Sequence, residues 1–172
     1  MFTYYMPTKV FFGKGCIAQS GEVLADLGRK ALLVTGRHSA KVNGSQAGVV
    51  EKLDELGIYW LIFDEVENNP SVATIRKAAA LALEKGVDFV IGIGGGSPMD
   101  AAKAIAPVCT QELDDEQLFT GPYRKPLPIV AVPTTAGTGS EVTKVSFLTN
   151  PKAGTKQSIN TPLIFLVYAF AD

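Results

Sequence analysis

Residues 92–97 read Gly-Ile-Gly-Gly-Gly-Ser and stand between an apolar run and an alanine-rich stretch. The run before them, 87–93, is rich in β-branched residues and is typical of a buried parallel strand. Ser97, Pro98 and Asp100 are residue types favoured in the first turn of a helix, as N-cap, first helical residue and capping-box partner. The sequence therefore predicts a strand, a glycine turn and a helix in that order.

Such a junction can bind an anion. The free N–H groups at a helix start carry the positive end of the helix dipole and point outward. Glycines 94–96 have no Cβ atoms, so a phosphate can approach the backbone and positive φ angles cost little. A plain tight turn is the alternative, but one glycine would usually satisfy it. We therefore expect this turn to bind a phosphate.

A second polar loop follows another predicted strand. Residues 133–140 carry four hydroxyl side chains, on Thr134, Thr135, Thr138 and Ser140, with glycines between them. Hydroxyls at this density can donate hydrogen bonds to a phosphate, a ribose or an amide. The same residue types also make ordinary turns. Taken with the glycine turn, the loop favours a long ligand, of which a dinucleotide is the simplest.

Predicted strands alternate with predicted helices along the chain. This alternation indicates an α/β fold with a mainly parallel sheet flanked by helices, after a β-rich N-terminal segment. In such sheets ligands lie at the carboxyl ends of the strands. The expected strands are 9–15, 31–35, 59–63, 87–93, 127–132, 144–149 and parts of 157–172, and the expected helices are 17–27, 45–56, 72–85 and one that begins at Ser97.

Composition excludes several classes of protein. The chain has 172 residues, 47% of them hydrophobic, and a net charge of −1, which suits one globular domain. Without a basic stripe, binding to nucleic acid is not expected. No apolar run is long enough for a membrane span, and the N-terminus does not resemble a signal peptide. The two distant cysteines suit free thiols in a reducing cytoplasm.

The loop after the strand 31–35 bears on the choice of cofactor. NAD-binding folds of this kind usually place an Asp or Glu there to accept the ribose hydroxyls. This chain has Gly36, followed by Arg37, His38 and Ser39, with Lys41 close behind. A carboxylate would repel a 2′-phosphate, whereas basic and hydroxyl groups would bind one. The pattern predicts NADP in preference to NAD.

Groups that could catalyse a reaction or bind a metal are sparse. His38 is the only histidine, and the carboxylates of 114–116 lie in a segment that reads as solvated. No His, Cys and Asp set has the spacing of a metal site, and no nucleophile has a base in view. The residues alone thus indicate nucleotide binding, with neither catalytic residues nor metal ligands assigned.

Two stretches, "GGGSPMDAAKA" and "PTTAGTGSEVT", resemble the signatures of the iron-containing alcohol dehydrogenases, and the 1,3-propanediol and butanol dehydrogenase-like members in particular. The likeness extends over the chain, through "YYMPTKVFFGKG", "ENNPS" and "TPLIFLVYAFAD". It implies a nucleotide-binding domain over 1–172, related in fold to dehydroquinate synthase and glycerol dehydrogenase. It also implies a following helical domain, absent here, that would hold the iron or other divalent metal.

The resemblance assigns roles residue by residue. Pyrophosphate contacts fall on Gly95, Gly96 and Ser97, threonine-loop contacts on Thr134, Thr135 and Thr138, a ribose-side lysine on Lys156, an adenosine-side residue on Asn69, and the NADP-type pattern on Gly36 with Ser39. The family's reaction is hydride transfer between a small alcohol or aldehyde and NAD(P). Without the helical half we expect this chain to be inactive alone and to form a homo-oligomer.

Two alternatives to this reading stay open. One is a non-catalytic NADP-binding module. The other is the nucleotide domain of a dehydroquinate synthase-like or glycerol dehydrogenase-like enzyme, which would share the glycine turn.

Overall fold

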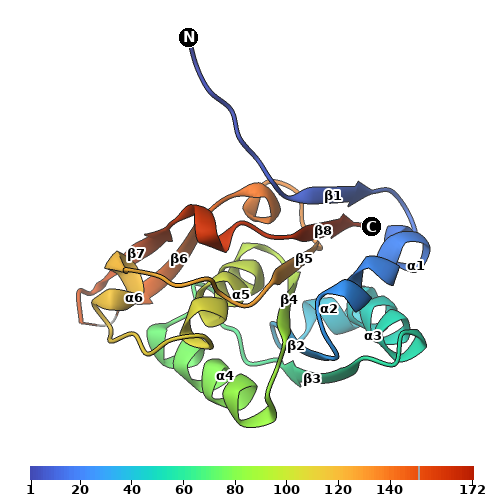
Figure 1. Cartoon of the computed structure of the whole chain (residues 1–172), viewed down its shortest axis with the longest axis horizontal. Helices are drawn as coiled ribbons and strands as arrows, with labels where there is room; N and C mark the ends of the chain where they lie inside the picture. The colour runs from blue at the N-terminus through green and yellow to red at the C-terminus, as the bar shows by residue number, and fades with distance from the viewer. Residues whose placement is uncertain (151) are drawn as a thin grey trace.

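The computed structural model describes residues 1–150 and 152–172. Its centre is a six-stranded sheet in the order β1-β8-β5-β4-β2-β3, in which every neighbouring pair is parallel (Figure 1). Strands β6 and β7 form a separate antiparallel hairpin. The strands are β1 (Lys9–Phe12), β2 (Lys30–Thr35), β3 (Tyr59–Phe63), β4 (Phe89–Gly94), β5 (Ile129–Pro133), β6 (Val145–Asn150), β7 (Thr155–Asn160) and β8 (Tyr168–Ala171).

Helices connect the strands and cover both faces of the sheet. The α-helices are α1 (Cys16–Ser20), α2 (Ser39–Val42), α3 (Ser45–Glu55), α4 (Val72–Lys85), α5 (Gly96–Val108) and α6 (Gln117–Thr120), and the 3₁₀ helices are η1 (Gly21–Asp26), η2 (Ser140–Val142) and η3 (Pro162–Ile164). Apolar residues of α4 and α5 pack in one core cluster, and those of α1, η1 and α3 pack in another. The expected α/β fold with a mainly parallel sheet is confirmed.

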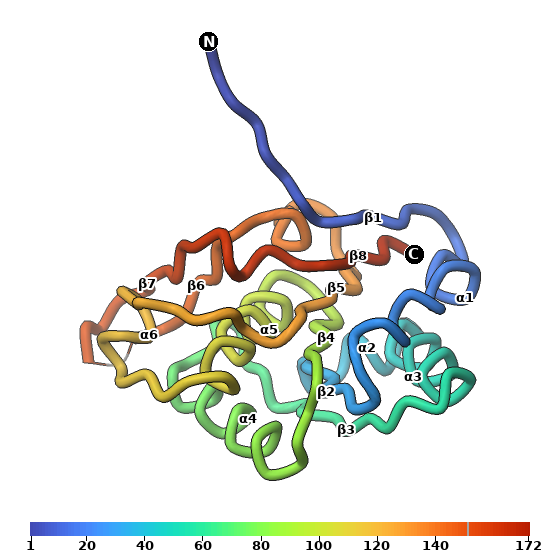
Figure 2. The backbone as a smooth tube through the Cα atoms, in the orientation of Figure 1, coloured from blue at the N-terminus to red at the C-terminus, as the bar shows by residue number. Residues whose placement is uncertain are grey.

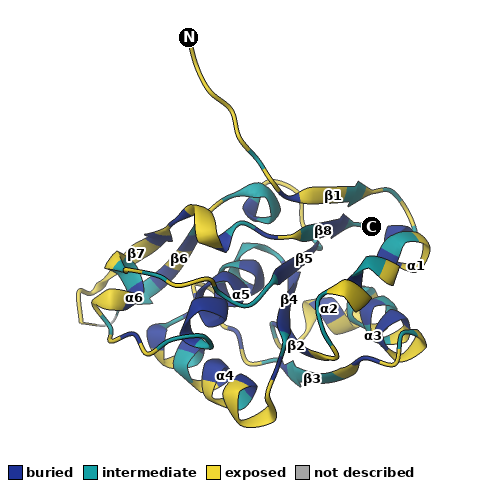
Figure 3. Ribbon diagram, viewed as in Figure 1, coloured by how far each residue is buried: buried dark blue, intermediate teal, exposed yellow. Residues whose placement is uncertain are grey.

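The middle of the sheet is the most deeply buried part of the molecule (Figure 3). Every residue of β4 is buried, and so is every residue of β2 after Lys30. Strands covered on both faces have no polar side to alternate with, which is why they read as continuous apolar runs in the sequence.

The chain reverses direction across the sheet at β2. From β2 it crosses to β3 on one side, and β4 then pairs with the other side of β2. The helices after β2 and β4 therefore leave toward opposite faces, with α3 in one core cluster and α5 in the other. The carboxyl ends of β2 and β4, where the strand order reverses, are the usual ligand position in such folds.

The prediction of one continuous α-helix over 17–27 is wrong. The segment is α1 followed at once by the 3₁₀ helix η1, which begins at Gly21. A Cβ on Gly21 would lie 2.6 Å from Lys52 Cγ, so α3 approaches the backbone closely at this point. The glycine needed for that approach also lowers the preference for a continuous α-helix.

The segment before β1 extends away from the body of the molecule toward the N-terminus (Figures 1 and 2), and Thr8, next to the strand, is buried. Met1, Phe2, Tyr4 and Tyr5 in this segment are exposed. Strand β1 forms one edge of the sheet, and among the described residues it pairs with β8 alone. Within the described part of the chain, no helix has the length and apolar character that crossing a membrane requires.

Candidate functional site

The glycine turn lies where β4 ends and α5 begins. Gly94 has φ 143°, but Gly95 has φ −79° and becomes the N-cap of α5. The expectation of positive φ through 94–96 thus holds at Gly94 alone. Glycine is required at Gly92 for another reason, because a Cβ there would lie 3.0 Å from Met99 Cα. The turn brings strand and helix backbones close together, as a phosphate site needs.

Ser97 does not cap the helix, contrary to the prediction. Helix α5 begins one residue earlier, at Gly96, and the Ser97 hydroxyl accepts a hydrogen bond of 3.1 Å from the Asn69 N–H. Asn69 has φ 59°, a left-handed conformation that asparagine tolerates better than most residues. Asp100 does not complete a capping box either, because its carboxylate accepts from the Ser140 hydroxyl and the Phe147 N–H.

The threonine loop lies directly against the glycine turn. The Thr134 N–H donates to the Gly94 carbonyl at 2.9 Å and extends the pairing of β5 with β4. A Cβ on Gly95 would lie 3.1 Å from Thr135 Oγ1, and one on Gly96 would lie 3.3 Å from Thr138 Cγ2. Thr135 and Thr138 are exposed. The structure therefore brings together the two loops that the sequence singled out.

Asn69 connects this region to the β6–β7 hairpin. Its carbonyl accepts from the Thr149 hydroxyl at 3.0 Å. The hairpin register places Lys156 directly opposite Thr149, so the two side chains share one face of the hairpin. Lys156 is exposed there. Asn69 and Lys156 are thus connected through Thr149, and their adenosine-side and ribose-side roles stay predictions.

Gly36 directly follows β2, beside the end of β4. The register pairs Thr35 with Ile93, so Gly36 and Gly94 come next on neighbouring strands. Ser39 is exposed at the start of the short helix α2. Lys41, expected to attract a phosphate, instead forms a 2.6 Å ion pair with the Asp64 carboxylate.

Asp64 is a residue that the sequence reasoning missed. It follows β3 directly, and its pKa is lowered by the hydrogen bond from Lys41. Its position one strand over from β2 is the signal that could have found it, because loops after adjacent parallel strands meet at the same edge.

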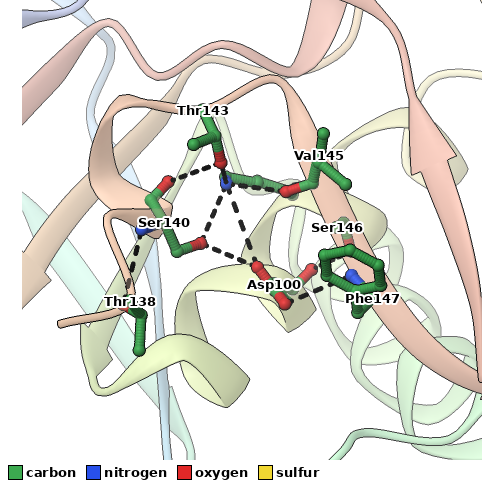
Figure 4. Close-up of polar contacts among 8 residues, drawn as sticks. Asp100, Thr138, Ser140, Thr143, Val145, Ser146 and Phe147 are labelled. Atoms are coloured by element: carbon green, nitrogen blue, oxygen red, sulfur yellow. Dashed lines mark hydrogen bonds and ion pairs between the residues drawn. The ribbon is translucent and has the colours of Figure 1, made fainter.

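A cluster of buried polar groups contacts the end of the threonine loop and the residues that follow it. Lys103, on α5, is completely buried, and its ammonium group donates to Ser140 Oγ at 2.9 Å, Thr143 Oγ1 at 3.1 Å and the Val145 carbonyl at 2.8 Å. Figure 4 shows these acceptors gathered beside Asp100. Burial lowers the pKa of Lys103 to about 8 and raises the pKa of Asp100. Lys103 could not be found from the sequence, because helical lysines are almost always exposed and no neighbouring residue marks this one as buried.

Residues that could hold a metal are not assembled. Among residues 1–150 and 152–172, no group of three or more His, Cys, Asp or Glu side chains is placed to bind an ion. His38 is exposed beside α2. The side chains described here therefore do not fit a bound iron.

The family model for iron-containing alcohol dehydrogenases matches residues 7–172. This chain belongs to that family. The likeness expected from its signatures is confirmed. The members of the iron-containing alcohol dehydrogenase family that it resembles include both classes named from the sequence.

One curated relative is the probable NADH-dependent butanol dehydrogenase 1 of Bacillus subtilis (strain 168), 36% identical over 99% of this chain and 45% of the relative. Another is the 1,3-propanediol dehydrogenase of Klebsiella pneumoniae, 39% identical over 96% of this chain and 47% of the relative. A solved iron-containing alcohol dehydrogenase from Thermotoga maritima superposes with a TM-score of 0.91 at 44% identity, over 100% of this chain and 48% of that one. The chain thus spans slightly less than half the length of these relatives.

Proposed function

We propose that this chain is the nicotinamide-dinucleotide-binding half of an enzyme that transfers hydride between a small alcohol and its aldehyde. The observation that carries the proposal is the contact between the glycine turn and the threonine loop at the carboxyl edge of the sheet. Family membership supplies the class of reaction. Whether this polypeptide also turns over substrate by itself is a separate question.

Different residues of the site contact different parts of the nucleotide in this proposal. The N–H groups of Gly95, Gly96 and Ser97 at the start of α5 hold the diphosphate, helped by the dipole of a 13-residue helix. Thr134, Thr135 and Thr138 donate hydroxyls from the facing loop. Asn69 and Lys156 contact the adenosine side in this arrangement. The bound nicotinamide ring would accept or supply the hydride.

Calorimetric titration of the purified chain with NAD, NADP and ADP-ribose tests the proposal. We expect saturable binding of about one nucleotide per chain, and ADP-ribose should bind because the expected contacts are to its diphosphate and ribose. Absence of saturable binding of all three at millimolar concentration would refute the proposed function, because dissociation constants above about 1 mM correspond to less than about 4 kcal/mol of binding.

The preference between the two cofactors is also a proposal. We propose that NADP binds more tightly, because Gly36 leaves no carboxylate to repel a 2′-phosphate and Arg37 follows it. Two observations weigh against it. Lys41 is already paired with Asp64, and the Bacillus relative is named as NADH-dependent.

Replacing Gly36 tests the preference directly. A Cβ at this position would meet only the Val66 carbonyl at 3.5 Å, so the chain can accommodate a side chain there. Gly36→Asp is expected to weaken NADP binding by about tenfold through charge repulsion, and to leave NAD binding unchanged or stronger. Gly36→Asn is the matched uncharged control. Tighter binding of NAD than NADP by the parent chain would contradict the proposed preference.

Self-association is the third part of the proposal. Strand β1 presents an unpaired edge, Phe12 on it is 88% exposed, and aromatic side chains before it are also exposed. Unpaired edges and exposed apolar surface promote association. Light scattering at micromolar concentration should give the mass of a dimer or larger, and Phe12→Lys should lower that mass. A monomer at every concentration would contradict this part.

A further inference from the structure

One segment of the chain supplies acceptors for all three N–H donors of the Lys103 ammonium group. Its side chain is 0% exposed, although lysine is almost never fully buried. The three acceptors of its protons, Ser140 Oγ, Thr143 Oγ1 and the Val145 carbonyl, all belong to residues 140–145, which leave the threonine loop. An ammonium group has three N–H donors. Each therefore has an acceptor, and the segment is fixed to α5 at three points.

The contact chain continues from this segment to the glycine turn. The Ser140 hydroxyl donates a hydrogen bond to Asp100 Oδ1 at 2.7 Å, and the Ser140 N–H donates to Thr138 Oγ1 at 3.4 Å (Figure 4). Thr138 in turn lies against Gly96. Gly96, Asp100 and Lys103 are spaced four and three residues apart, so they follow one face of α5. One helix face thus carries both the start of the anion site and the residue that secures the facing loop.

We propose that Lys103 is a positioning residue for nucleotide binding, which holds the threonine loop at the distance from the glycine turn that the diphosphate requires. It would not touch the nucleotide. This inference rests on the proposed function, and it identifies the residue that holds the threonine loop in place.

Stability alone does not account for this lysine. Removing an ammonium group from water costs several kcal/mol, and a well-packed apolar replacement is often as stable or more stable. The nearest carboxylate oxygen, on Asp100, is 3.9 Å away, so direct ion pairing compensates only part of that cost. The hydrogen bonds order the loop in a way that an apolar side chain cannot.

Substitution separates positioning from packing. Lys103→Met keeps a long unbranched side chain and removes all three donors. It is expected to weaken NADH binding about tenfold in a fluorescence titration, the effect of losing roughly one charged hydrogen bond. Lys52→Met is the matched control, because Lys52 is also buried but lies on α3 and pairs with Glu55. The control should bind NADH as the parent does.

A milder variant covers the case in which Lys103→Met fails to fold. Thr143→Val removes one acceptor with little change of shape, and it should weaken binding about threefold, since one neutral partner is lost. Thermal unfolding of each variant shows whether it is folded at the temperature of the titration. Parent-like NADH affinity in a folded Lys103→Met or Thr143→Val would overturn the inference.

The pH profile supplies a measurement that a packing role would not move. The charged groups that face Lys103 are Asp100 on its own helix and Glu141 on η2, and both carboxylates favour the protonated amine. With the pKa of Lys103 at about 8, the amine loses a donor as pH rises. NADH affinity of the parent should therefore fall about fivefold or more between pH 7 and 9.5.

Lys103→Met should show a flat profile over the same range. A flat profile in the parent, or an equal decline in the variant, would refute the inference. These outcomes differ from failure of the proposed function, in which the parent itself does not bind nucleotide at pH 7.

Discussion

A Gly96→Val variant is expected to bind NADH at least about 100-fold more weakly than the parent chain, a loss of about 2.7 kcal/mol. A Cβ at this position would already lie 3.3 Å from Thr138 Cγ2. The two further methyl groups of valine would then occupy the space between the glycine turn and the threonine loop. They would push Thr138 away and cover the N–H groups that are to hold the diphosphate.

The fold should survive this substitution. Gly96 does not have a positive φ angle, so valine adds no left-handed strain, and its cost in helix preference is modest. The control is Ala80→Val, which adds the two γ-methyl groups of valine at an exposed position of α4. Calorimetric titration and thermal unfolding should be measured on both variants. A dissociation constant for Gly96→Val within threefold of the parent value would contradict the site described here.

The second large effect concerns turnover. The purified 172-residue chain, given NAD or NADP, a primary alcohol and Fe²⁺, Zn²⁺ or Mn²⁺, should produce no metal-dependent reduced cofactor. Nucleotide binding is proposed for this chain, but its described side chains do not assemble three ligands around an ion. Structural and catalytic metal sites commonly need three or four such ligands. We therefore expect this polypeptide to bind the cofactor without catalysing the reaction.

The measurement needs a control for contaminating host dehydrogenases. Gly96→Val, purified in the same way, should give the same background absorbance change at 340 nm as the parent. Metal-stimulated turnover that is present in the parent and absent from Gly96→Val would show that the chain is catalytic by itself, and this prediction would be wrong.

Local signals predicted the elements around the site well. Ser71 caps α4 by accepting from the Thr74 N–H, and Gly86 ends that helix in a left-handed conformation. Both features depend on residues within a single turn of the chain, so the sequence carries them. The buried strands were predicted equally well, because strands that are covered on both faces consist almost entirely of apolar residues.

Features that depend on distant partners were missed. Ser97 has the residue type of a helix cap, but its hydroxyl is taken by the Asn69 N–H, 28 residues away. Lys41 has the charge to bind a phosphate, but Asp64 neutralises it from the next loop. Lys103 is an ordinary helical lysine in the sequence, and only the packing of residues 140–145 over α5 makes it a buried anchor. The sequence shows which polar groups a side chain carries, but the fold determines which distant residue those groups contact.

The pairing of β1 with β8 bears on how the molecule reaches its native state. Lys9 pairs with Tyr168 and Phe12 with Ala171, so the sheet is completed by two strands that lie far apart in the sequence. At roughly 5–20 residues per second of synthesis, the first strand would wait on the order of 10–30 s for its partner. Contacts this distant in sequence also form slowly. Chaperones that shield the nascent N-terminal segment should therefore raise the yield of native protein more than they raise its final stability.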